Sequence, residues 1–168
     1  MSTSSAIKGT RRVMLSSSWF SPEEEAFLAE VQREAAKNDS ISDLSWCLNA
    51  DGQWGETDVT EHPEVAKDIT WKTRTFLNDV TCVKAQDCIL LAMVPGHEDT
   101  GAVAEAAMAY AWGKPVVLVL PDYAMSDKAD TKINLMPAML ADTCIGISDL
   151  ADFDFNHIRN NPYPGMVY

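Results

Sequence analysis

The stretch "CILLAMVPGHEDTGAVAEAAMAYAWGKPVVLVL", residues 88–120, contains two apolar runs separated by a helical pattern. The runs 88–94 and 115–120 are continuously apolar, which is typical of parallel strands covered on both faces. Between them, the sequence predicts a helix that opens at Asp99 and ends at Gly113. A strand–helix–strand unit of this kind predicts a parallel sheet with helices on both faces.

The segment before this unit extends the same alternation. Residues 13–15 form a short apolar run followed by three serines, which indicates a strand that ends in a loop. The next stretch, residues 21–38, predicts a helix, because Ser21 is a good N-cap and Glu24 completes a capping box. Phe27, Leu28, Val31 and Ala35 recur on one face of that helix and are expected to be buried.

A second long helix is predicted from Pro63 to about Ala85. Its buried face is expected to carry Val65, Ile69, Phe76, Val80 and Val83. Residues 143–147, "TCIGI", are expected to form a last strand at the edge of the sheet. We expect one domain over residues 11–168, preceded by a flexible extension over residues 1–10.

Composition narrows the class of protein. The 168 residues carry a net charge of −12, which argues against binding the phosphate backbone of DNA or RNA. We find no apolar run of membrane-spanning length and no signal peptide, and we expect a cytoplasmic protein. The four cysteines show no CxxC spacing and the three histidines no ligand pair, so the sequence favours reduced thiols and predicts no metal site.

Three carboxylates are expected near the carboxyl ends of the strands. Glu105 is the only charged residue between Gly101 and Trp112, and burying an ionised carboxylate without a partner is unfavourable. Asp99 opens the same helix and also suits a simple N-cap, whereas Asp79 lies at the edge of the preceding helix's apolar face and could equally turn to solvent. Such a group could form a metal cage, which the positive end of the helix dipole disfavours, or perform glycosyl transfer.

Several segments, taken in order, resemble the nucleoside 2-deoxyribosyltransferase family. The strongest is residues 133–168, "INLMPAMLADTCIGISDLADFDFNHIRNNPYPGMVY". The pieces "SSSWF" (16–20), "EHPE" (61–64), "FLND" (76–79) and the stretch 99–122 fit in the same order. The resemblance runs from about residue 13 to residue 168. It implies a single-domain flavodoxin-like (Rossmann-like) α/β fold and a transferase that uses no cofactor and no metal.

The resemblance also implies catalytic roles. Glu105 falls at the position of the family's nucleophile. Asp99 matches an acidic residue of the sugar- and base-binding region. Asp79 matches an acid that contacts the base and can assist its protonation.

Six further positions are expected to contact substrate or shape its site. Gln53 matches a glutamine that contacts the base, and Phe20 an aromatic wall. Asn134 and Met136 match residues that reach into the neighbouring subunit's site, which implies a homo-oligomer, either a dimer or a hexamer built as a trimer of dimers. The terminal carboxylate of Tyr168 matches a contact to the sugar's 5′-hydroxyl.

The sixth position departs from the family. Met14 stands where the family usually has a tyrosine whose hydroxyl orients the nucleophile, and methionine cannot donate that hydrogen bond. Ser16 or a water is the alternative donor. Residues 106–108, Ala-Ala-Met, replace the usual Leu-Gly-Tyr, and the loop 121–132 is longer than usual.

Three functions are therefore weighed. The leading one is transfer of the 2-deoxyribosyl group between purine or pyrimidine bases, with nucleosides and free nucleobases as its small-molecule partners. An N-glycoside hydrolase of deoxynucleosides or their 5′-monophosphates would need phosphate donors, which Ser16–Ser18 could supply but Arg11 and Arg12, at the other end of the strand, could not. A non-catalytic nucleoside-binding domain would leave Glu105 unexplained.

Overall fold

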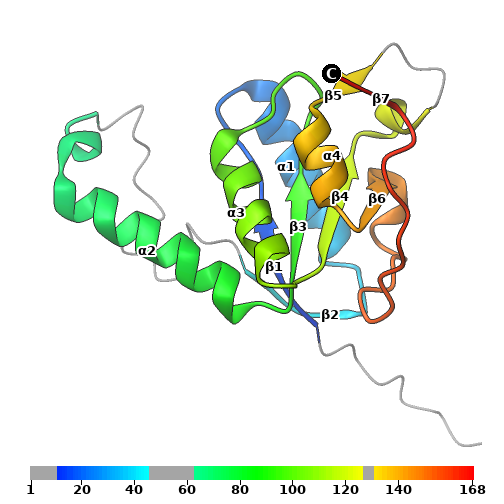
Figure 1. Cartoon of the computed structure of the whole chain (residues 1–168), viewed down its shortest axis with the longest axis horizontal. Helices are drawn as coiled ribbons and strands as arrows, with labels where there is room; N and C mark the ends of the chain where they lie inside the picture. Colours follow the sequence, from blue (N-terminus) through cyan, green and yellow to red (C-terminus); the bar gives the residue numbers. More distant parts are fainter. Residues whose placement is uncertain (1–10, 46–62, 127–130) are drawn as a thin grey trace, which may run out of the picture.

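The computed structural model describes residues 11–45, 63–126 and 131–168. The expected flexible extension 1–10 lies outside the described residues. Five parallel strands form one sheet in the order β2-β1-β3-β4-β6 (Figure 1). They are β1 (Arg11–Ser16), β2 (Ile41–Ser45), β3 (Cys88–Ala92), β4 (Val116–Leu120) and β6 (Thr143–Gly146). The predicted parallel α/β sheet is confirmed, with β6 at its edge.

Helices cover both faces of the sheet. The helix α1 (Pro22–Ala35) packs on one face together with Leu150 and Phe155. The helices α2 (Ile69–Ala85), α3 (Thr100–Ala111) and α4 (Leu135–Leu140) contribute to the apolar cluster on the other face. Both central strands, β3 and β4, are buried along their whole length, as their continuous apolar sequences predicted.

The predicted helix signals are also confirmed. Ser21 caps α1, because its side chain accepts a hydrogen bond from the Glu24 backbone N–H at 3.3 Å. Asp99 caps α3 through a 2.7 Å bond from the Ala102 N–H to its Oδ1. Gly113 follows α3 with a φ of 69°, the left-handed conformation that glycine adopts readily at a helix end.

The prediction for α2 was wrong in two respects. The helix begins at Ile69 and not at Pro63, since Asp68 caps it and only a short 3-10 turn, Val65–Lys67, precedes it. Of the predicted buried face only Val83 is buried, beside Cys82, whereas Ile69 and Phe76 are 72% and 62% exposed. In Figure 1 the N-terminal half of α2 projects away from the sheet. Periodicity identified an apolar stripe, but not what would cover it.

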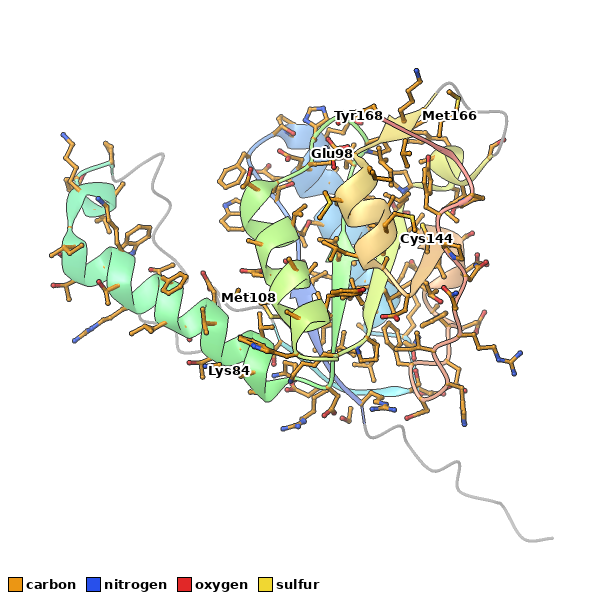
Figure 2. The ribbon with its side chains drawn as sticks, viewed as in Figure 1. Lys84, Glu98, Met108, Cys144, Met166 and Tyr168 are labelled. Carbon is orange, nitrogen blue, oxygen red and sulfur yellow. The ribbon has the colours of Figure 1, made fainter. Side chains whose placement is uncertain are left out.

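Two small features close the carboxyl-terminal part of the chain. A second, two-stranded parallel sheet joins β5 (Lys132–Ile133) to β7 (Met166–Val167). Figure 2 shows Met166 and Tyr168 on this segment, above α4. Short 3-10 turns lie at Asp122–Met125 and Ile147–Asp149. The chain end is therefore fixed beside the start of α4.

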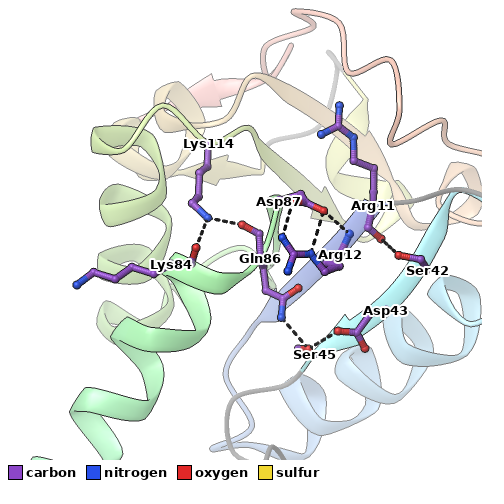
Figure 3. Close-up of polar contacts among 9 residues, drawn as sticks. All are labelled: Arg11, Arg12, Ser42, Asp43, Ser45, Lys84, Gln86, Asp87 and Lys114. Atoms are coloured by element: carbon purple, nitrogen blue, oxygen red, sulfur yellow. Dashed lines mark hydrogen bonds and ion pairs between the residues drawn. The ribbon is translucent and has the colours of Figure 1, made fainter.

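A polar network fastens the amino ends of the strands (Figure 3). Arg12 forms a 3.0 Å ion pair with Asp87 through Nη2, and the Asp87 backbone N–H donates to the Arg12 carbonyl at 2.8 Å. Lys114 donates to the backbone carbonyls of Lys84 and Gln86. These ion-pair and hydrogen-bond contacts therefore join the amino ends of the strands, opposite to their carboxyl ends.

Candidate active site

The sheet order places a topological switch point between β1 and β3. The chain leaves β1 toward α1 on one face and leaves β3 toward α3 on the other face. In open α/β sheets, ligands bind beyond the carboxyl ends of the strands at such a point. Ser16 ends β1 and pairs in register with Leu91 of β3, and the loop to Asp99 follows β3. This is where the predicted carboxylates meet.

Strand geometry brings Ser16 to Glu105. Side chains alternate along β1, so that Val13 and Leu15 pack toward α1 whereas Met14 packs with Ala102 and Ala106 of α3. Ser16 follows Met14 by two residues and faces the same helix. Its Oγ donates a hydrogen bond to Glu105 Oε2 and lies 3.4 Å from the Ala102 carbonyl oxygen.

The environment of Glu105 disfavours its charge. The pKa of Glu105 is raised from 4.5 to about 7, and burial is the largest cause. The negative charges of Asp79 and Asp99 act in the same direction as burial, whereas the hydrogen bond from Ser16 lowers the pKa. Near neutral pH, the protonated and ionised forms of Glu105 are therefore both well populated.

Asp79 approaches from α2. It is half-buried on that helix, and burial raises its pKa from 3.8 to about 6. Its charge acts on Glu105, which places the two carboxyls within electrostatic reach. Two carboxyls that both titrate close to neutrality suit proton transfer and nucleophilic attack in one site.

Asp99 combines a structural position with an electrostatic one. Its Oδ1 caps α3, as the simpler interpretation of the sequence expected. Its charge also contributes to the raised pKa of Glu105, six residues further along the chain. The capping bond fixes this carboxylate within electrostatic reach of Glu105.

A second group, around Glu98, adjoins the first. Glu98 Oε2 accepts a 3.0 Å hydrogen bond from the Tyr168 hydroxyl, and Oε1 accepts one from the Asn134 backbone N–H at 3.2 Å. Figure 2 shows Glu98 and Tyr168 close together above α4. The Asn134 side chain caps α4 by accepting from the Met136 N–H at 2.9 Å. The structure thus brings Asn134 and Tyr168 next to the Asp99 loop.

Sequence reasoning did not identify Glu98. It stands in the acidic segment "HEDT", but its partners lie 36 and 70 residues away, in segments whose pairing depends on the β5–β7 sheet. The acidic residues of this segment gave no indication of these distant partners. Within residues 11–45, 63–126 and 131–168, no group of three or more His, Cys, Asp or Glu side chains could hold a metal ion.

The remaining predicted residues differ in their surroundings. Phe20 is 60% exposed and its ring is tilted against that of Trp19, with ring centroids 5.0 Å apart. Met136 is also 60% exposed, on α4. Met14 is fully buried in the apolar core. Gln53 lies outside the described residues.

A shallow groove of about 380 Å³ lies elsewhere, along the edge strand β6 and the segment 149–161. Its polar lining includes Asp152, His157 and Arg159, and it contains none of the predicted site residues.

No helix of the described segments is long and apolar enough to cross a membrane.

The fold and the paired carboxyls define an α/β protein with a carboxylate-based site at a topological switch point. The sequence profile of the family described as nucleoside 2-deoxyribosyltransferase matches residues 13–136. Two curated relatives, both named nucleoside deoxyribosyltransferase, are similar to most of this chain. That of Lactobacillus leichmannii is 32% identical over 158 residues, 94% of this chain and 98% of the relative. That of Lactobacillus johnsonii is 34% identical over 150 residues, 89% of this chain and 98% of the relative.

A solved structure of a 2-deoxyribosyltransferase from Bacillus psychrosaccharolyticus has the same fold. It superposes with a TM-score of 0.64 at 22% identity, over 90% of this chain and 98% of that one. The chain belongs to the nucleoside 2-deoxyribosyltransferase family and is a transferase.

Proposed function

We propose that this protein transfers the 2-deoxyribosyl group of a nucleoside from one purine or pyrimidine base to another, with Glu105 as the nucleophile. The observation that carries the proposal is the single carboxyl group in α3, hydrogen-bonded by Ser16 at the switch point and flanked by Asp79 and Asp99. The family membership of the chain and the names of its relatives support the same reaction.

The proposed reaction proceeds in two displacements. An ionised Glu105 oxygen attacks C1′, and the electron pair of the C1′–N bond leaves with the base. The departing base takes a proton from Asp79, which holds a proton below about pH 6. A second base then attacks C1′ of the deoxyribosyl ester, its own proton passes to Asp79, and Glu105 is released as a carboxylate. Two inversions give overall retention of configuration.

The contacts of the serine segment favour a nucleoside over a 5′-monophosphate. The Ser17 hydroxyl donates to the Ser18 carbonyl at 3.2 Å. Burial raises the pKa of the nearby Glu24, but hydrogen bonds with Ser18 and Ser21 outweigh burial and keep that carboxyl ionised. An anion beside the serines repels phosphate, and Arg12 is held by Asp87 at the other end of β1. The hydrolase of monophosphates is therefore the weaker candidate.

We also propose that the active unit is a homo-oligomer. Met136 and Met139 of α4 are 60% and 62% exposed, and Ile69, Phe76 and Leu77 of α2 are 53–72% exposed. Exposed apolar side chains on two helices that cover the same face of the sheet suit a subunit interface. In that assembly Asn134 and Met136 would complete the neighbouring subunit's site.

The decisive experiment supplies thymidine and adenine, with further donor and acceptor pairs in parallel. We expect chromatography to show deoxyadenosine and thymine in equal amounts. Thymine without deoxyadenosine would indicate a hydrolase, and no turnover with any pair would indicate a binding domain. Glu105→Ala should abolish transfer, and a 2-fluoro-sugar nucleoside should leave an adduct on Glu105 detectable by mass spectrometry.

The matched control is Glu34→Ala, which removes a partly exposed carboxylate from α1. Glu34 pairs with Lys37 at 2.8 Å, on the face of the sheet opposite to α3. Full activity of Glu105→Ala, or an adduct on another residue, would overturn the assignment of the nucleophile.

A further inference from the structure

The Ser16 hydroxyl has two acceptors but only one proton. Its side chain is buried, with 2% of its residue surface exposed, at the last position of β1. Oγ contacts Glu105 Oε2 on one side and the Ala102 carbonyl oxygen, at 3.4 Å, on the other. A carbonyl oxygen can only accept, whereas a carboxyl group accepts when ionised and donates when protonated. Both contacts can therefore be hydrogen bonds only when Glu105 is protonated and donates to Ser16 Oγ, because an ionised Glu105 competes with the Ala102 carbonyl for the single hydroxyl proton.

We propose that Ser16 is a positioning residue for Glu105, and that its hydroxyl donates to the Glu105 carboxylate when Glu105 is ionised and to the Ala102 carbonyl when Glu105 is protonated. This inference rests on the proposed role of Glu105 as the nucleophile. In the ionised state the carboxylate accepts a hydrogen bond from the Ser16 hydroxyl. In the protonated state Glu105 donates to Ser16 Oγ, and the hydroxyl turns to the helix carbonyl.

The charges around Glu105 make this hydroxyl important. Asp79 on α2 and Asp99 at the start of α3 both face Glu105 with negative charge, and burial acts in the same direction. The facing strand β1 contributes the neutral Ser16 and Met14. Within the described part of the chain, the Ser16 hydrogen bond is the contact that favours the charged form of Glu105. It stabilises the form that attacks.

The contact also selects the attacking oxygen. Because Ser16 holds Oε2, the free oxygen Oε1 forms the new bond to C1′, while the C1′–N bond breaks and its electron pair departs with the base. The resulting ester is neutral and a weaker acceptor than the carboxylate. The hydroxyl then turns to the Ala102 carbonyl, and it returns when the second base releases Glu105.

Ser16→Ala tests the inference, and Ser17→Ala is the matched control. Ser17 is buried in the next position, and its hydroxyl bonds the Ser18 carbonyl. Carbon-13 NMR of glutamate-labelled protein follows the Glu105 carboxyl through pH, with Glu105→Gln to assign the signal. Loss of a hydrogen bond to a charged group should raise the pKa of Glu105 by about one to two units in Ser16→Ala. Ser17→Ala should leave it unchanged, and Ser16→Cys, a weaker donor of similar shape, should fall between.

Single-turnover kinetics give the second readout. Formation of the deoxyribosyl ester at pH 7 should slow about ten- to hundredfold in Ser16→Ala, with its pH midpoint moved up and KM nearly unchanged. An unchanged Glu105 titration in Ser16→Ala would overturn the inference. The titration needs no turnover, so a shifted titration in a protein that transfers no sugar would refute the proposed function and support the positioning role of Ser16.

Discussion

Replacing Glu105 with glutamine should make the protein more stable at alkaline pH. Folding raises the pKa of Glu105 from 4.5 to about 7, so the folded chain binds this proton more tightly than the unfolded chain. The free energy of unfolding must then fall as pH rises from about 4.5 to about 7, and stay level above that range. Glutamine keeps an acceptor for Ser16 but has no charge to bury.

The size of the effect follows from the shift. About 2.5 pH units at roughly 1.4 kcal/mol per unit correspond to about 3 kcal/mol. The stability difference between Glu105→Gln and the parent should be smallest near pH 4 and grow to about 3 kcal/mol above pH 8. For a chain of 168 residues this is a rise in Tm of about 6–12 °C.

Urea unfolding at a series of pH values, at one protein concentration, measures this difference. Glu34→Gln is a control of opposite sign, because hydrogen bonds from Lys37 lower the pKa of Glu34. That variant should lose a little stability as pH rises above the range where Glu34 ionises. If Glu105→Gln raises the free energy of unfolding by the same amount at every pH, the conclusion that burial disfavours the charged form of Glu105 is wrong.

Three further predictions concern activity and assembly. The rate of ester formation should follow a narrow bell-shaped pH profile centred near pH 6.5, because Glu105 must be ionised and Asp79 protonated. With a pKa of about 7 for Glu105 and about 6 for Asp79, only about one molecule in twenty meets both conditions at that pH. A profile whose rate does not fall at alkaline pH would contradict the role of Asp79 as the proton donor. Met14→Tyr, assayed with deoxyadenosine and adenosine, should change the transfer rate by less than about tenfold, since Ser16 already holds the carboxyl; a hundredfold gain would show that it does not. Sedimentation should find active protein as an oligomer that Met136→Asp weakens, and an active monomer would contradict the interface.

The sequence predicted the elements whose own residues determine their structure. The strands β3 and β4 are apolar throughout, and Ser21 and Asp99 carry the hydrogen-bonding groups that open α1 and α3. The strand β2, "ISDLS", was missed because an edge strand with exposed polar side chains has no such signature. The two-residue strands β5 and β7 exist only through their mutual pairing, which local sequence cannot reveal.

The site divides in the same way. A lone carboxylate in an apolar helix was sufficient to single out Glu105. Its contact with Ser16 depends on the alternation of β1 and on the packing of α3 over that strand, and it was only one of two alternatives in the sequence. The bonds of Glu98 to Tyr168 and Asn134 are tertiary and had no local signal.

In the proposed oligomer, the projecting helix α2 would link Asp79 to the association of the subunits. Its C-terminal end is anchored by Cys82 and Val83, its free half carries Phe76 in solvent, and Asp79 lies between the two. A partner subunit packed on the free half of α2 would reduce the exposure of the adjacent Asp79, and desolvation is what raises the pKa of that carboxyl. Assembly of the subunits and protonation of Asp79 would then favour each other. Low pH would promote association, and dilution would lower the pKa of Asp79.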